Sequence, residues 1–188
     1  VLGNVSYARR DAAGGSEQED VLLEAEKACI RAKNLTRQLL TFARGGAPMK
    51  QPTNIGRLTE ESARMTGSGS KVKLRTWVEP GLKSADADSA QIGQAVQNIV
   101  LNALQATPNG GVVEVRAENA LGRSPLEPDS GEQPFVKISV QDWGNGIPPE
   151  YRDRIFDPYF TTKPGGTGLG LATVHSIVQR HGGYVEMR

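Results

Sequence analysis

At 188 residues the chain is long enough for one large domain or two small ones, and its 22 basic and 21 acidic residues leave no charge excess for binding nucleic acid or an anionic membrane. Its single cysteine, Cys29, excludes an internal disulfide and a cysteine-based zinc site. No apolar run approaches the ~20 residues that span a bilayer, and no signal peptide is recognisable, which predicts a cytoplasmic location, although the parent protein could be membrane-anchored.

The first 46 residues predict a helical hairpin. Helical patterns cover residues 1–12 and 21–42, and the glycine-containing segment DAAGGSEQED separates them. The second pattern repeats small apolar residues at heptad spacing, which indicates packing in a helix bundle and termination at Gly45-Gly46 before Pro48. The heptad residues are Ala25, Ala32 and Leu39 at one position and Val21, Ala28, Leu35 and Phe42 at another.

The middle of the chain predicts strands and one short helix. Residues 51–65 indicate a short strand and a helix that turns Ile55, Leu58 and Ala63 inward. Residues 71–79 alternate between apolar and charged side chains, as in a half-buried strand. GGVVEVRAE and FVKISVQDW supply two more strands, joined by a proline-rich loop at residues 121–134. Antiparallel strands covered by helices on one side predict a two-layer α/β sandwich in an α+β fold.

A longer helix is predicted near residues 89–106. Asp88 or Ser89 would cap it, and Gln91 would complete a capping box with Asp88. The helix is apolar over most of its surface, but Asn98 and Asn102 continue an amide stripe at helical spacing. A buried amide without a partner costs ~1–3 kcal/mol, so the stripe faces either a polar ligand or metal, or the backbone of a nearby loop.

A glycine run follows the last strand. Gly166, Gly168 and Gly170 let the backbone turn sharply and present N–H groups to an anion. The next segment, LGLATVHSIVQRH, has helical spacing, and the N-terminus of that helix would face the same anion. A phosphate is the expected ligand, although glycine runs of this kind also occur in purely structural turns.

Four motifs in this order resemble the N, G1, F and G2 boxes of the sensor histidine kinases: QNIVLNA, DWGNG, IFDPYF and GGTGLGL. The similar region extends from about Pro48 to the end of the chain. The resemblance implies an ATP-binding domain with the nucleotide between helices and a lid at residues 163–167. The hairpin, with LLTFAR, resembles the second helix of the family's dimerisation and phosphoacceptor domain, which forms a dimeric four-helix bundle.

The resemblance also implies roles for individual residues. Asp142 would accept a hydrogen bond from the adenine amino group, and Lys163 would reach the phosphates. Asn102 would bind Mg²⁺, with Asn98 as the second candidate for that metal. Phe156 and Phe160 either cover the pocket edge or pack in the core. The expected nucleotide-binding residues are Asn98, Asn102, Asp142, Gly144, Gly146, Ile147, Phe156, Phe160, Thr162, Lys163, Gly166, Thr167, Gly168, Leu169, Gly170 and Leu171.

Three functions of different classes follow from these motifs. In the first, the chain binds Mg-ATP and transfers the γ-phosphate to a histidine, which passes it to an aspartate of a response-regulator receiver domain. The second is an ATP-hydrolysing machine of the chaperone or mismatch-repair type, and the third is a pseudokinase scaffold. Asn98 disfavours hydrolysis, because an amide cannot act as the general base that a glutamate provides there. The intact Asp142, Asn102 and G2 glycines disfavour a pseudokinase.

In relatives of this type, VLGN follows an HDFNN-like H-box, whereas this chain begins with VLGN. The prediction is therefore a fragment: residues 1–46 as a partial hairpin without the phosphoacceptor, and residues 47–188 as an ATP-binding domain that stops within a strand at 184–187. The two histidines, His175 and His181, lack an acidic neighbour in sequence and are expected to be structural. No catalytic residue is assigned with certainty.

Overall fold

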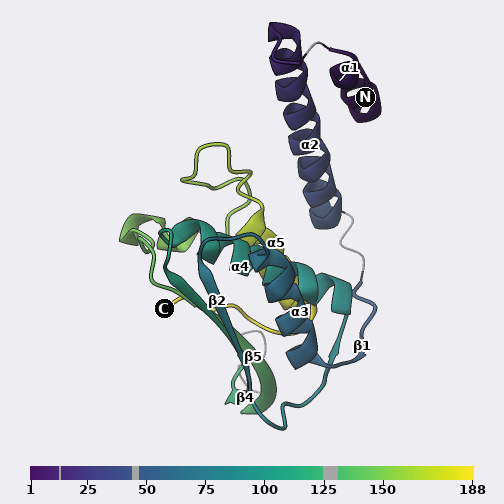
Figure 1. Ribbon diagram of the computed structural model, residues 1–188. Coiled ribbons are helices and arrows are strands. Elements are labelled where there is room, and N and C mark those ends of the chain that lie inside the picture. The colour runs from purple at the N-terminus through teal and green to yellow at the C-terminus, as the bar shows by residue number, and fades with distance from the viewer. Residues whose placement is uncertain (13, 44–46, 125–130) are drawn as a thin grey trace. The chain divides into compact units, whose positions relative to one another are not determined.

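A computed structural model describes residues 1–12, 14–43, 47–124 and 131–188, while the side chains of Arg31 and of residues 33–43 lie outside the description. The chain divides into two compact units, Val1–Arg44 and Gly45–Arg188 (Figure 1). None of the described helices is long and apolar enough to cross a membrane. The expected helix end at Gly45-Gly46 falls outside the described residues.

The first unit is a pair of helices, as expected from the sequence. Helix α1 (Leu2–Asp11) contacts α2 (Glu17–Ala43). Glu26 of α2 joins them, because its carboxylate accepts a hydrogen bond from the Ser6 hydroxyl and pairs with Arg9 at 2.9 Å. Val21 of the heptad pattern is 63% exposed, and Ala28 is also exposed. The side chains of Leu35, Leu39 and Phe42 lie outside the description.

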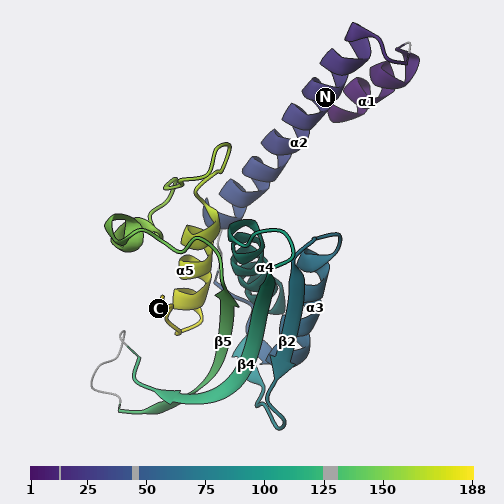
Figure 2. The same ribbon diagram turned by 60° about the vertical axis from the view of Figure 1, so that its left-hand side comes forward.

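The second unit has two layers, with three helices beside a three-stranded sheet (Figures 1 and 2). The sheet has the order β2 (Lys73–Val78), β4 (Val112–Gly122), β5 (Gln133–Asp142), and β5 runs antiparallel to β4. A separate two-stranded sheet pairs β1 (Gln51–Thr53) with β3 (Ala85–Ala87). The helices are α3 (Ile55–Gly67), α4 (Ser89–Ala106) and α5 (Gly170–Arg180). The predicted two-layer architecture is therefore confirmed.

Helix α4 lies between the two parts of the apolar core. One face of α4, including the fully buried Val100, packs with Ala63 of α3 and with Val113 and Val115 of β4. The other face places Ala95 against α5, including the fully buried Val174. Burying a valine side chain stabilises the fold by ~1.5–3 kcal/mol. The helix that carries the amide stripe is thus packed on two sides.

Two expectations about the strands are wrong, and one strand was missed. The β2–β4 pair is parallel, with Lys73 opposite Val112. After β2 the chain passes through β3 and α4, and it enters β4 in the same direction as β2. Strand β3 was not expected, since three residues of sequence ADA carry no strand pattern. Residues 184–187 do not form a described strand, although Tyr184 packs edge-on against the Phe135 ring at 5.6 Å.

The N-terminus of α4 is held by Asp88, as expected. Its Oδ1 accepts hydrogen bonds from the backbone N–H groups of Ala90 and Gln91, and its Oδ2 accepts one from Met49. The capping box is incomplete, however, because the Asp88 N–H donates to His181 Nε2 at 3.0 Å instead of to the Gln91 side chain. The Nδ1 atom of His181 lies 2.8 Å from the Ile177 carbonyl oxygen. Because Nε2 accepts, Nδ1–H is the donor, and His181 joins the end of α5 to the start of α4.

This cap makes the stability of the second unit pH-dependent. Burial raises the pKa of Asp88, but hydrogen bonds from Gln91, Met49 and Ala90 outweigh it and hold the pKa below the usual value of 3.8. A lowered folded-state pKa stabilises the fold above the unfolded pKa, and this contribution is lost as the pH falls through the folded value. Asp88→Ala should lower the free energy of unfolding at pH 7 by ~1 kcal/mol, measured by urea denaturation. Asp88→Asn should keep the cap on Ala90 and Gln91, and should lose both the Met49 hydrogen bond and the acid-dependent part of the contribution.

Candidate ATP-binding site

The amide stripe of α4 faces the start of α5 and the lid segment. Asn98 Nδ2 donates a hydrogen bond to the carbonyl oxygen of Gly170 at 3.3 Å. A Cβ atom on Gly170 would lie 3.6 Å from Asn102 Nδ2, so both asparagines adjoin the first residue of α5. The Asn98 NH₂ group therefore has a backbone partner, which was one of the two explanations expected for the amide stripe. That explanation does not cover the Asn102 side-chain oxygen.

That oxygen faces a cation from the lid. The Lys163 ammonium donates to Asn102 Oδ1 at 3.2 Å and to Gln105 Oε1 at 2.8 Å. Burial lowers the pKa of Lys163, and the attraction of the Asp142 carboxylate opposes this effect. Two amide oxygens of α4 thus hold the Lys163 ammonium, and the Asp142 carboxylate at the end of β5 attracts it. Gln105 was missed in the sequence, although its position three residues after Asn102 places it on the same helix face.

The turn after β5 approaches α4 closely. Asp142 is half-buried, and its Oδ1 accepts a hydrogen bond from the Gly144 N–H at 2.9 Å. A Cβ on Gly144 would lie 2.3 Å from the backbone oxygen of Ala106, so no larger residue fits there. Gly146 has a φ of 67° and continues the turn. The turn leaves Asp142 Oδ2 without a hydrogen bond among the described residues, available to a ligand.

The glycine loop before α5 is fixed at one point by a buried side chain. Leu169 is fully buried, and its carbonyl oxygen accepts from Thr173 N–H and from the Thr173 hydroxyl. The N-cap of α5 makes no side-chain hydrogen bond, so the first N–H groups of the helix lack a protein acceptor of that kind. Such a helix start attracts anions through its N–H groups and dipole.

The segment before this loop contains a strained residue. Tyr159 has a φ of 68°, and its N–H donates to the Gly168 carbonyl at 3.0 Å. The Phe160 N–H donates to the Asp157 carbonyl oxygen at 3.2 Å and closes a turn. Tyr159 occupies the third position of this turn, where a positive φ favours glycine. The Tyr159 side chain is 65% exposed, so burial of its ring does little to offset the backbone strain.

Tyr159→Gly should therefore stabilise the fold relative to Tyr159→Ala. Both changes remove the ring, but only glycine relieves the left-handed backbone, which costs an L-residue about 1–2 kcal/mol. We expect the glycine variant to be more stable by ~1 kcal/mol in urea denaturation, after the greater unfolded-state entropy of glycine is included. Equal stability of the two variants would contradict the strain.

The aromatic residues of this segment pack on each other and on α5. Phe160 lies 5.5 Å from the Tyr151 ring, and Arg154 lies 4.7 Å above its face. Tyr151 and Arg154 belong to a short 3₁₀ helix, η2 (Pro149–Arg154), which the sequence did not predict. Phe156 is half-buried and contacts the His175 ring of α5 at 5.5 Å. Both phenylalanines thus support the segment around the site.

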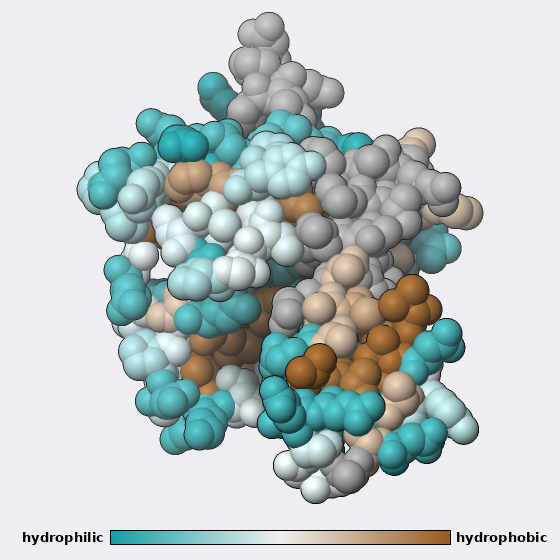
Figure 3. All heavy atoms as spheres, turned by 90° about the horizontal axis from the view of Figure 1, so that it is seen from above, coloured by the Kyte–Doolittle hydropathy of each residue, from teal (hydrophilic) through white to brown (hydrophobic). Residues whose placement is uncertain are grey.

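The other predicted site residues lie around these groups. Thr161 Oγ1 accepts a hydrogen bond from the Lys163 N–H at 3.1 Å. Gly166 lies next to the same hydroxyl, since a Cβ atom on Gly166 would be 2.5 Å from Thr161 Oγ1. Ile147 is 37% exposed. Figure 3 shows a hollow on the side of the segment that follows β5, with apolar residues at its floor and hydrophilic residues around its rim. The remaining residues are Thr162 and Thr167, which are exposed, and Leu171, which is half-buried in the first turn of α5.

Residues 87–188 match the family of histidine kinase-, DNA gyrase B-, and HSP90-like ATPases. The chain belongs to this family. The match covers α4, both long strands, the lid segment and α5, which are the elements that bring Asn102, Asp142 and Lys163 together. It confirms the family predicted from the N, G1, F and G2 motifs.

Relatives within this ATPase family include sensor kinases that match far beyond those residues. Sensor histidine kinase ZraS of Escherichia coli strain K12 is 34% identical over 190 residues, which cover 100% of this chain and 38% of ZraS. Sensor kinase CckA of Brucella abortus is 34% identical over 82% of this chain and 17% of CckA. The chain thus spans less than half the length of these curated relatives.

Solved structures agree with the fold. Full-length ShkA in complex with AMPPNP has a TM-score of 0.75 at 27% identity, covering 96% of this chain and 37% of ShkA. The mycobacterial sensor histidine kinase MprB has a TM-score of 0.59 at 28% identity, covering 71% of this chain and 81% of the MprB chain. The ShkA likeness includes the helical unit as well as the ATPase fold.

Proposed function

We propose that this chain is the dimerisation and ATP-binding region of a two-component sensor histidine kinase. It binds Mg-ATP and positions the γ-phosphate for a phosphoacceptor histidine outside residues 1–188, and that histidine passes the phosphoryl group to a response-regulator aspartate. The contact between Asn102 and Lys163 beside the start of α5, together with the open Asp142 carboxylate in the turn after β5, carries the proposal. Catalysis in such a site consists of positioning and charge neutralisation more than of covalent chemistry by the protein.

Each end of the nucleotide has a matching group. The free Oδ2 of Asp142 accepts a hydrogen bond from the adenine amino group, and the open space beside Gly146 lets the base approach the turn. The N–H groups at the start of α5 bind phosphate oxygens. Lys163 supplies a point charge for the phosphates once it leaves its amide partners.

The donors present fit a magnesium ion. Asn102 Oδ1 is a neutral oxygen that already accepts a hydrogen bond from a cation, the Lys163 ammonium. A bound metal ion would take the place of this ammonium. Magnesium prefers oxygen ligands and is commonly shared with nucleotide phosphates, whose negative charge it neutralises. Asn102 is therefore the proposed ligand. Asn98 has its NH₂ on the Gly170 carbonyl, so its oxygen remains the second candidate.

Asn102→Ala should remove most of the Mg²⁺ dependence of ATP binding. We expect the affinity gained on adding Mg²⁺ to fall by about tenfold, or ~1.4 kcal/mol, because one ligand oxygen is lost. Calorimetric titration of ATP with Mg²⁺ and with a chelator measures the difference. Lys163→Met is the control, because it also breaks the Lys163–Asn102 contact but keeps the oxygen. An equal loss of Mg²⁺ dependence in Lys163→Met would contradict metal binding by Asn102.

The hydrolysing alternative is disfavoured at the same place. Asn98 occupies the N-box position at which hydrolysing relatives carry a glutamate, and its NH₂ group donates a hydrogen bond to the Gly170 carbonyl oxygen. An amide has no titratable proton with which to activate water. The pseudokinase alternative is disfavoured because Asp142, Asn102 and the glycine loop are all in contact with the rest of the site.

The proposed partners are a second copy of the chain and a receiver domain. Support for a homodimer comes from Val21 and Ala28 of α2, whose exposed positions repeat with heptad spacing. The receiver domain is proposed because the N, G1, F and G2 motifs resemble those of sensor histidine kinases, which act on such domains. A dimer of helical pairs would form the four-helix bundle expected from the sequence.

The decisive experiment supplies a phosphoacceptor histidine on a second protein. The chain is incubated with radiolabelled Mg-ATP and the separately purified phosphoacceptor region of ZraS, a relative of which 38% of the length matches this chain at 34% identity. We expect acid-labile label on the ZraS region with the wild-type chain and none with Asp142→Ala. Release of inorganic phosphate without labelled protein would favour the hydrolase. Bound ATP with neither product would favour the pseudokinase.

A further inference from the structure

The second unit carries an open strand edge beside a groove, away from the ATP site. Strand β2 lies at one margin of the sheet, with α3 alongside it (Figures 1 and 2). A groove of about 660 Å³ follows this margin between α3 and β2. Arg57 and Arg64 of α3 border the groove, and Val72, Leu74 and Thr76 line it. We call it the β2 edge groove.

The backbone along this edge has hydrogen-bonding groups to offer. Lys73 N–H donates to Gly111 and Glu79 N–H donates to Ala117, so the odd-numbered residues of the strand face β4. Because backbone direction alternates along a strand, the N–H and C=O groups of Leu74, Thr76 and Val78 face the other way. In the described part of the chain β2 pairs with β4 alone. An exposed edge of this kind is a template for another strand.

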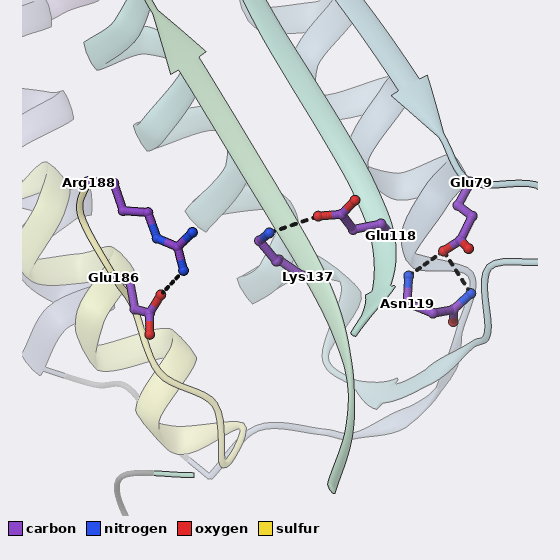
Figure 4. Close-up of polar contacts among 6 residues, drawn as sticks. All are labelled: Glu79, Glu118, Asn119, Lys137, Glu186 and Arg188. Atoms are coloured by element: carbon purple, nitrogen blue, oxygen red, sulfur yellow. Dashed lines mark hydrogen bonds and ion pairs between the residues drawn. The ribbon is translucent and has the colours of Figure 1, made fainter. Parts of the chain in front are cut away.

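The edge is held in place at its ends. A Cβ on Gly67 would lie 2.9 Å from Leu74 Cδ2, so α3 lies directly on the strand there. At the far end, Glu79 Oε2 accepts hydrogen bonds from Asn119 N–H and Nδ2 at 2.6 and 3.0 Å, which joins the residue after β2 to β4 (Figure 4). A strand that docks here therefore meets a preformed template, which lowers the entropic cost of binding.

The two faces of the edge specify different side chains. Toward α3, the groove offers the half-buried Leu74 as an apolar contact, next to the buried Val72. On the opposite face, Lys73 and Arg75 are exposed, and Trp77 is 48% exposed beside them. Arg75 lies 3.5 Å from Glu114, but that carboxylate also pairs with Arg116 at 2.9 Å. The outer face of the edge therefore keeps an excess of positive charge.

We propose that the β2 edge groove binds an extended strand of a partner protein in which apolar residues alternate with acidic ones. The partner strand hydrogen-bonds to Leu74, Thr76 and Val78, places its apolar side chains in the groove, and places its carboxylates against Lys73 and Arg75. Glu60 and Glu61 also border the groove, but Glu61 is paired with Arg57 at 2.7 Å. A second copy of this chain fits less well, because β2 against β2 brings Lys73 and Arg75 against like charges.

A labelled eight-residue peptide in which valine alternates with glutamate tests the proposal by fluorescence anisotropy on the 188-residue chain. Its counterpart with lysine in place of glutamate is the matched control. We expect saturable binding of the glutamate peptide, at least tenfold tighter than that of the lysine peptide. Hydrogen exchange should slow at Thr76 on binding. Absence of binding, or equal binding of the two peptides, would overturn the proposal.

Variants separate the backbone and charge contributions. Thr76→Pro removes an N–H that faces away from β4, which an edge strand tolerates, and should reduce peptide binding at least tenfold. Lys73→Glu should reverse the preference toward the lysine peptide, while Lys83→Glu, at an exposed loop position, should leave it unchanged. Peptide binding unaffected by the first two variants would overturn the proposal. A dimer in sedimentation equilibrium that Thr76→Pro dissociates would overturn it in favour of a second copy.

Discussion

Asp142→Ala is expected to lower the affinity of the chain for ATP by about 100-fold, or ~2.7 kcal/mol, which is typical of a lost hydrogen bond to a charged group. Two effects combine in this change. The adenine amino group loses its acceptor, and the Gly144 N–H loses the 2.9 Å hydrogen bond that shapes the turn. Calorimetric titration with Mg-ATP measures the affinity.

Two controls separate these effects. Asp142→Asn keeps an oxygen for the Gly144 N–H, so it preserves the turn while it removes the charge. Asp153→Ala removes an exposed carboxylate in η2 and should leave affinity unchanged. If Asp142→Ala binds ATP as tightly as the wild type while remaining folded, the assignment of the adenine end of the site is wrong.

Gly168→Ala should be the most damaging single change in the glycine loop. Gly168 has a φ of 66°, and a Cβ there would lie 2.3 Å from the backbone carbonyl carbon of Tyr159. Backbone atoms cannot rotate aside as a flexible side chain can. We expect a loss of ~3 kcal/mol in the free energy of unfolding, from left-handed strain and overpacking together, or a displaced loop with ATP binding lost.

Gly165→Ala is the matched control for this change. Gly165 has a similar φ of 73°, but no atom lies within 4 Å of the position of a Cβ. Gly165→Ala should therefore lower the free energy of unfolding only by the cost of the left-handed backbone, about 1 kcal/mol. Urea denaturation and ATP titration of the two variants separate strain from steric exclusion. Equal effects of the two variants would mean that the Tyr159–Gly168 approach is not required.

The architecture was predictable where the sequence carries a local period. The amphipathic spacing of α4 and α5 and the alternation of β4 follow from which side chains must be buried, and Val100, Val113 and Val174 at such positions are fully buried. The alternation of β2 is followed less closely, because Thr76 on its predicted inner face is exposed. The direction of β2 relative to β4 was not predictable, because parallel and antiparallel strands share the same alternation. Strand β3 is too short for a period to exist.

The contacts of the site were less accessible than its residues. Motifs identified Asn102 and Lys163, but not that the Lys163 ammonium would rest on Gln105, which lies 58 residues earlier in the chain. Likewise, Asp88 and Gln91 have the spacing of a capping box, yet His181, 93 residues away, accepts the Asp88 N–H instead. Local spacing cannot report such competition, because the competing group arrives only when α5 folds against α4.

The two tryptophans of this chain have a consequence for its spectroscopy. Trp143 adjoins Asp142 and is 56% exposed, whereas Trp77 lies on the outer face of the β2 edge and is 48% exposed. Indole emission depends on exposure to water, so each ring is an intrinsic optical probe of its own surface. Replacement of one tryptophan by phenylalanine leaves a single emitter. Trp143→Phe and Trp77→Phe thus turn the same protein into two sensors, one for the strand edge and one for the nucleotide turn.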